Sequence, residues 1–260
     1  MPDHHRDGQS VQFWARTNLL QRRLSLSVGA GPYRYYDTTA VGGPLGFADK
    51  HGWAGIGSVA ATYYTPSGWL YEVRANRVVA HGSIDTTSLL VGIGYQLERP
   101  EATGPCAVLP PQTRKTTHNE LTFFLGRTIV NSFQSQHDTA RAIEYRHGLS
   151  PHVDWTVGWI NEGDARLIRR NGLTSQFWLV RPFLNGRFML GAGLGPYISI
   201  DRYRAPKPGE ATRATVSALV TATAAIRINP RLLLRGSWNR IATTYNRDSD
   251  VVLIGLGLRY

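Results

Sequence analysis

The sequence contains one cysteine, three lysines and no long hydrophobic run. A single thiol excludes an internal disulfide and a cysteine zinc site, so Cys106 has neither role. No apolar run reaches the roughly 18 residues that a transmembrane helix requires, which excludes a helical membrane span. The first eight residues are polar throughout and lack the apolar segment of a signal peptide.

The net charge of +11 is carried almost wholly by arginine, because lysine occurs only at Lys50, Lys115 and Lys207. Arginine binds phosphate in a bidentate manner, so nucleic acid and the phosphates of lipopolysaccharide are both compatible with this charge. The arginines are scattered among apolar segments instead of gathered on one helix or sheet face, which argues against a nucleic-acid partner. With 42% hydrophobic and 18% charged residues, the chain is too apolar to be disordered.

Part of the sequence occurs twice. Phe13 and Phe177 are separated by the same number of positions as Pro32 and Pro196, and the residues around each member of a pair resemble those around the other. The repeated segments are Gln12-Phe13-Trp14 with Gln176-Phe177-Trp178, Gly29-Ala30-Gly31-Pro32-Tyr33 with Gly193-Leu194-Gly195-Pro196-Tyr197, and Gly92-Ile93-Gly94 with Gly255-Leu256-Gly257. Such a period predicts a duplicated architecture.

Both copies alternate apolar with small or polar residues, which is the period of a β-strand. In the second copy we expect eight strands, near 119–131, 139–149, 153–161, 173–182, 187–200, 214–228, 231–242 and 250–260. In the first copy we expect five, near 10–18, 23–36, 52–65, 68–79 and 87–97.

The connections alternate between short turns, as at Leu184-Asn185-Gly186, and long polar loops near 132–138, 162–172, 201–213 and 243–249. Antiparallel strands of about ten residues with short turns at one end and long loops at the other are typical of a transmembrane β-barrel. The fold class predicted is therefore all-β, an antiparallel transmembrane β-barrel. On the strand 187–200, the face with Met189, Gly191, Gly193 and Ser199 is expected to face the lumen, where a small barrel has little room. Charged residues inferred to face the lumen, and expected to pair with one another, are Glu144, Arg146, Asp154, Arg227, Arg235 and Arg259.

Three segments follow from this reading: a partial five-strand repeat over 1–98, a proline-rich periplasmic linker over 99–117, and a complete eight-strand barrel over 118–260. Five strands cannot close a barrel without leaving unpaired edges in lipid. Either the two copies are tandem units, the first of them truncated, or they share one larger barrel. Met1 would then fall within an external loop equivalent to 162–172, and we expect a fragmentary start.

The closing strand Val251–Tyr260 alternates apolar residues and ends on an aromatic residue. It resembles the C-terminal strand of bacterial outer-membrane β-barrel proteins. The resemblance implies a location in the bacterial outer membrane, contact with outer-membrane lipids and lipopolysaccharide, and recognition by the outer-membrane assembly machinery. Small barrels of this kind include structural proteins, narrow channels and lipid A acyl hydrolases, so the fold leaves the function open.

His147, Ser150 and Glu162 are the candidates for catalysis. They invite comparison with the lipid A deacylase barrels, in which a histidine and a serine two residues apart act with an acidic residue. In this chain His147 and Ser150 are three apart, so an extended strand would place them on opposite faces. That departure argues against the pairing of base and nucleophile that hydrolysis needs.

A second candidate site is a basic external rim that binds anions or lipid phosphates, formed by Arg169, Arg170, Arg202, Arg204 and Lys207. We find no zinc motif, phosphate loop or nucleophile elbow, and predict neither metal nor cofactor. The favoured function is an outer-membrane barrel with a structural, surface-binding or narrow-pore role. The alternatives are a lipid A acyl hydrolase and a soluble barrel that binds a small apolar ligand.

Overall fold

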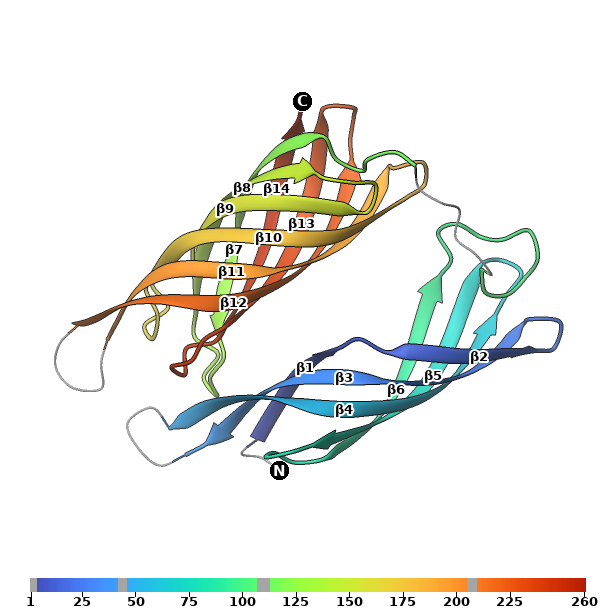
Figure 1. Cartoon of the computed structure of the whole chain (residues 1–260), viewed down its shortest axis with the longest axis horizontal. Coiled ribbons are helices and arrows are strands. Elements are labelled where there is room, and N and C mark those ends of the chain that lie inside the picture. The colour runs from blue at the N-terminus through green and yellow to red at the C-terminus, as the bar shows by residue number, and fades with distance from the viewer. Residues whose placement is uncertain (1–3, 42–45, 107–112, 205–209) are drawn as a thin grey trace. The chain divides into compact units, whose positions relative to one another are not determined.

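The computed structural model describes residues 4–41, 46–106, 113–204 and 210–260, and these form an all-β structure (Figure 1). The chain divides into two compact units, one with most of β1–β6 and the other with β7–β14. Within the described residues, no helix is long and apolar enough to span a membrane.

The first unit is an open antiparallel sheet. Its strands are β1 (His4–Ser10), β2 (Phe13–Leu19), β3 (Leu24–Ala40), β4 (Phe47–Tyr64), β5 (Trp69–Ala80) and β6 (Thr86–Tyr95). The order is β1-β3-β4-β5-β6, and β2 pairs with the first part of β3 while β1 pairs with the second. β1 and β2 therefore occupy a single strand position, interrupted between Ser10 and Phe13.

The second unit is a closed barrel of eight antiparallel strands. They are β7 (Asn119–Val130), β8 (His137–Gly148), β9 (Val153–Asn161), β10 (Arg170–Phe183), β11 (Phe188–Arg204), β12 (Glu210–Arg227), β13 (Leu232–Ala242) and β14 (Ser249–Arg259). β14 pairs with β7 over the whole length of both strands, which closes the sheet. These eight strands close on themselves, so the predicted alternative of one larger barrel shared by both copies is wrong.

The predicted strands are present in both units, but several are longer than expected: β3 ends at Ala40 instead of near 36, and β4 begins at Phe47 instead of near 52. The strand expected over 10–18 is divided into β1 and β2, and its first residue is His4. The strand expected from residue 173 begins at Arg170. Short turns and longer loops alternate as predicted, since β10 and β11 are joined by residues 184–187 and β13 and β14 by residues 243–248. The long loop expected over 201–213 is wrong, because β11 extends to Arg204 and β12 begins at Glu210.

A proline and a glycine explain the interruption between β1 and β2. Pro32 has no N–H to donate to the ladder, and Val11 N donates to its carbonyl oxygen over 3.2 Å. A Cβ at Gly31 would lie 1.9 Å from the Val11 carbonyl oxygen, so only glycine permits this approach. The barrel repeats the arrangement, because a Cβ at Gly195 would lie 1.9 Å from the Ser175 carbonyl oxygen.

The barrel is apolar outside and filled inside. On β11, Leu194 and Ile198 are 62% and 58% exposed, whereas Tyr197 and Ser199 are 0% and 2% exposed. The lumenal face predicted for this strand is confirmed. A soluble barrel carries the opposite pattern, with polar residues outside, so the exterior has the character of a membrane-spanning barrel.

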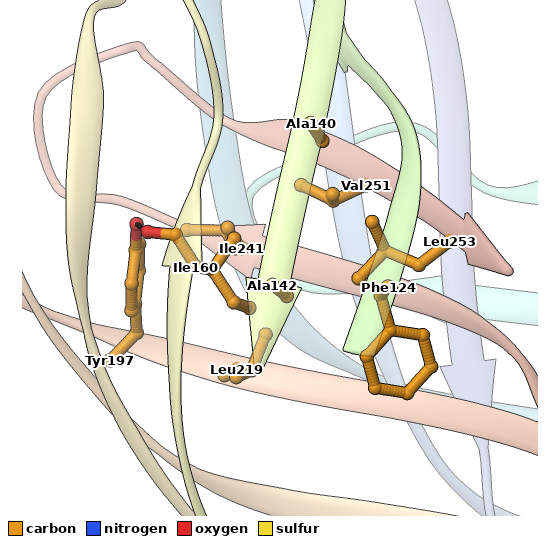
Figure 2. Close-up of a cluster of buried hydrophobic side chains, with 9 residues drawn as sticks. All are labelled: Phe124, Ala140, Ala142, Ile160, Tyr197, Leu219, Ile241, Val251 and Leu253. Carbon is orange, nitrogen blue, oxygen red and sulfur yellow. Dashed lines mark hydrogen bonds between the residues drawn. The ribbon is translucent and has the colours of Figure 1, made fainter. Parts of the chain in front are cut away.

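Apolar side chains fill the middle of the lumen. Figure 2 shows the cluster, in which Tyr197 and Leu219 meet residues from other strands of the barrel. Its members are Phe124, Ala140, Ala142, Ile160, Tyr197, Leu219, Ile241, Val251 and Leu253. A second cluster of Trp178, Val180, Met189, Ala225 and Leu233 lies nearer the short turns.

Candidate functional site

An arginine inside the barrel, on the short-turn side, is held by charge and by an aromatic ring. Arg146 on β8 is 1% exposed, and it donates to Glu144 Oε1 over 3.0 Å and to Asp154 Oδ2 over 3.4 Å. Its guanidinium carbon lies 4.0 Å from the centroid of the Trp178 ring, within cation–π range. Trp178 in turn donates from Nε1 to Thr156 Oγ1 over 2.9 Å. The expectation that Glu144, Arg146 and Asp154 pair in the lumen is confirmed.

A second ion pair joins the first strand of the barrel to its seventh. Arg235 on β13 donates from Nη2 and Nε to Glu120 Oε1 on β7, over 2.7 and 3.0 Å. Both side chains are fully buried. We did not predict Glu120 as a partner, because the two residues are 115 positions apart in sequence.

The long-loop end of the lumen is closed by a third network, centred on Arg170 and Glu162. Arg170 donates from Nε and Nη2 to the two carboxylate oxygens of Glu162, over 2.5 and 2.8 Å. It also donates to Ser249 Oγ over 2.7 Å and to the Arg247 carbonyl oxygen over 3.1 Å. Ser249 completes the ring by donating to Glu162 Oε2 over 2.6 Å.

Tyr245, in the loop between β13 and β14, extends this network to β11. Its hydroxyl donates to Asp201 Oδ2 over 2.8 Å and accepts from Arg170 Nη1 over 3.1 Å. Burial raises the pKa of Tyr245 to about 12, with the Arg170 guanidinium opposing the shift and the Asp201 carboxylate adding to it. The phenol therefore stays neutral and able to donate at physiological pH.

The first unit carries an arginine in the equivalent position. Arg6 precedes Arg170, and Asp37 precedes Asp201, by the same offset that separates the repeated motifs. Arg6 donates from Nε and Nη2 to the two carboxylate oxygens of Asp37, both over 2.7 Å, and from Nη1 to the Ile84 carbonyl oxygen. The barrel has the matching contact from Arg170 to a loop carbonyl. The carboxylate differs, because Arg170 pairs with Glu162.

The structure does not bring the three predicted catalytic residues together. His147 Nδ1 lies 2.8 Å from Asn119 Oδ1, and Ser150 Oγ accepts from the Val153 backbone N–H. Glu162 follows the far end of β9, which puts it roughly 25 Å along the strand from Ser150. Within the described part of the chain, no hydrogen bond or ion pair joins any two of these three side chains.

Of the predicted anion-binding residues, Arg170 is buried and engaged by Glu162, so its assignment to the surface is wrong. Arg169 is exposed, with its Nε 3.9 Å from Asp164 Oδ2, and Arg202 is also exposed. The side chain of Arg204 and all of Lys207 lie outside the described residues.

The sequence did hold a signal for the buried role of Arg170. An arginine and an aspartate recur together at the same offset as the repeated motifs, which is unexpected for residues of a solvated loop. No such signal marks Ser249 or Tyr245, because their partners come from distant strands. Among the described residues there is no group of three or more His, Cys, Asp or Glu side chains placed to hold a metal ion.

No family model matches the sequence, and no curated protein matches it either. Solved structures do resemble the fold. The N-terminal β-barrel domain of Pseudomonas aeruginosa OprF matches with a TM-score of 0.44 and 8% identity, covering 55% of this chain and 98% of its own. Neisserial surface protein A matches with a TM-score of 0.43 and 8% identity, covering 55% of this chain and 97% of its own. Ail of Yersinia pestis matches with a TM-score of 0.39 and 14% identity, covering 55% of this chain and 100% of its own.

These neighbours are small outer-membrane β-barrels. At such identities and TM-scores the likeness concerns the fold alone, and no activity is carried over from it. What this barrel can do has to be argued from its own surfaces and its own lumen.

Proposed function

We propose that this protein is a bacterial outer-membrane β-barrel with a closed lumen, acting as a structural or surface-binding protein and not as an open channel. One observation carries the proposal: the exterior is a belt of exposed apolar side chains, while the interior is filled by buried ion pairs and apolar clusters. In water this belt would be a large exposed apolar surface, which is unfavourable and promotes aggregation.

Two other functions fit the same geometry less well. A soluble barrel that binds an apolar ligand needs an empty apolar interior, but Tyr197, Leu219 and Ile241 are each 0% exposed inside this one. An acyl hydrolase needs a nucleophile beside a base, and His147 is engaged by Asn119 instead of Ser150.

The partners follow from location. The closing strand β14 and Tyr260, which is 72% exposed, suit recognition by the outer-membrane assembly machinery, as the resemblance implies. Arg169 and Arg202 are exposed on the long-loop rim, where lipopolysaccharide phosphates would be within reach. The matched geometry of Arg6 and Arg170, and of Gly31 and Gly195, supports an origin of the two units by duplication.

The test is to refold the full chain into phospholipid vesicles and into planar bilayers. The proposal predicts heat-modifiable gel migration, retention in the membrane fraction after alkaline extraction, and no steady single-channel conductance. A stable monomer without detergent would contradict the membrane assignment, and a steady open conductance would contradict the closed lumen.

A further inference from the structure

Three arginines converge on the short-turn mouth of the barrel. A small cavity there is lined by Arg187, Arg227 and Arg259, with Thr116 and Gly186 beside them and with Met189, Ala225 and Leu233 as further lining. The end of β14, marked C in Figure 1, belongs to this mouth. Among the described residues that line the cavity, none carries a carboxylate side chain.

Two of these cations lack a counter-ion. Within the described residues, the side chains of Arg187 and Arg227 make no hydrogen bond or ion pair, whereas Arg259 Nη2 donates to the Thr116 carbonyl oxygen over 2.8 Å. The lumenal carboxylates Glu120 and Asp154, whose charges also act on Arg259, form ion pairs with Arg235 and Arg146. Arg227 and Arg259 are partly buried, so water only partly screens the repulsion between their charges, and an anion between them would offset it.

Gly186 borders the cavity on the side of Arg227. Gly186 has a φ of +78°, and a Cβ at that position would lie 3.5 Å from Arg227 Nη1. The cavity has a volume of about 10 Å³, which admits one oxygen atom while the remainder of the ligand stays at the mouth. A phosphate group fits this description, because its other oxygens would reach the exposed Arg187.

We propose that Arg187, Arg227 and Arg259 form a binding site for a phosphate oxyanion at the short-turn mouth. The group can belong to a phospholipid headgroup or be free phosphate, and in both cases the guanidinium groups supply the same charge-assisted hydrogen bonds. In an outer-membrane barrel the short turns lie on the periplasmic side, at the level of the headgroups of the inner leaflet. The site is separate from the rim arginines at the opposite end.

The experiment uses the full chain, refolded in a phosphate-free maltoside detergent and titrated by calorimetry at constant ionic strength. One arm adds inorganic phosphate, and the other adds glycerophosphoglycerol, a soluble headgroup diester. Binding in either arm supports the site, and the arm that binds more tightly identifies the source. No heat above that of a chloride titration in both arms would overturn the proposal.

Variants separate the site from general attraction to a basic protein. Arg227→Gln and Arg259→Gln should each weaken binding roughly tenfold or more, the expected loss for one charge-assisted hydrogen bond. Arg231→Gln is the matched control, since this exposed arginine lies in the turn between β12 and β13 and does not line the cavity. Equal weakening by Arg231→Gln would show nonspecific attraction and refute the site. Heat-modifiable migration checks that each variant is folded.

Discussion

Removing the guanidinium of Arg170 should destabilise the barrel severely. Arg170→Met keeps much of the length of the side chain but leaves the fully buried carboxylate of Glu162 without its cationic partner, with only neutral hydroxyl groups such as that of Ser249 beside it. An unpaired buried charge of this kind costs about 3–5 kcal/mol. Because the same guanidinium also donates to Tyr245 and the Arg247 carbonyl, we expect the loss of unfolding free energy to lie within this range and not below it.

A double-mutant cycle isolates the contribution of the charge pair. Glu162→Gln with Arg170→Met removes both charges, and replacing a buried pair by neutral groups is often nearly neutral. The double variant should therefore be more stable than Arg170→Met alone, with a coupling energy of roughly 2 kcal/mol or more. Arg169→Met is the control, since its side chain is 55% exposed and its loss should cost less than about 0.5 kcal/mol.

The assay is urea unfolding of the full chain in phospholipid vesicles, followed by heat-modifiable gel migration and tryptophan fluorescence. The free energies of unfolding of the variants are compared with that of the wild type, provided that the slope of free energy against urea concentration is the same for all of them. A loss below about 1 kcal/mol for Arg170→Met, or additive losses in the double variant, would refute the argument that this buried pair closes the long-loop end.

Three further predictions test other features. Gly193→Ala should cost about 1–3 kcal/mol, because its Cβ would lie 2.6 Å from the Trp178 ring, whereas Gly236→Ala has no atom nearer than 4.0 Å and should cost less in the same urea assay. Leu194→Arg should destabilise the barrel in lipid by about 2–4 kcal/mol, and equal stability there would contradict a lipid-facing Leu194. Tyr245 should ionise near pH 12 instead of 10, so the stability that its neutral hydroxyl contributes is complete below pH 10 and lost as the pH rises through 12. The difference between the ultraviolet pH titrations of the wild type and Tyr245→Phe measures this ionisation. A difference that appears near pH 10 would contradict the prediction.

Much of the fold could be predicted because alternation and turn length are local properties. The face of β11 with Met189, Gly191 and Ser199 is lumenal as predicted, since a period of two assigns every second residue to one side. The division of β1 from β2 was missed, although Pro32 is visible in the sequence. Pro32 lies in β3, an inner strand of the sheet, so its missing N–H requires a break in the pairing with a neighbouring strand, and the place of that break depends on the register.

The polar network was harder to predict. Arg146 and Asp154 are neighbours across one hairpin, and their pairing follows from local register. Arg235 and Glu120 meet because the barrel closes, and Arg170 meets Ser249 across the lumen, so both contacts depend on the complete topology. A basic residue in an apparent loop was taken for surface charge, while the structure uses it to close the interior.

The central claim is that β7–β14 form a closed barrel with its apolar face in lipid and its lumen filled. The most direct test places single cysteines in a Cys106→Ser background at two adjacent pairs on β11, Met189 with Leu190 and Ile198 with Ser199, for fluorescent labelling in vesicles. Leu190 and Ile198, which are 41% and 58% exposed, should be labelled and quenched by a lipid-phase quencher. Met189 and Ser199, which are 7% and 2% exposed, should resist labelling and lipid-phase quenching. Equal lipid-phase quenching within each pair, or ready labelling of the lumenal positions by a water-soluble reagent, would contradict the account.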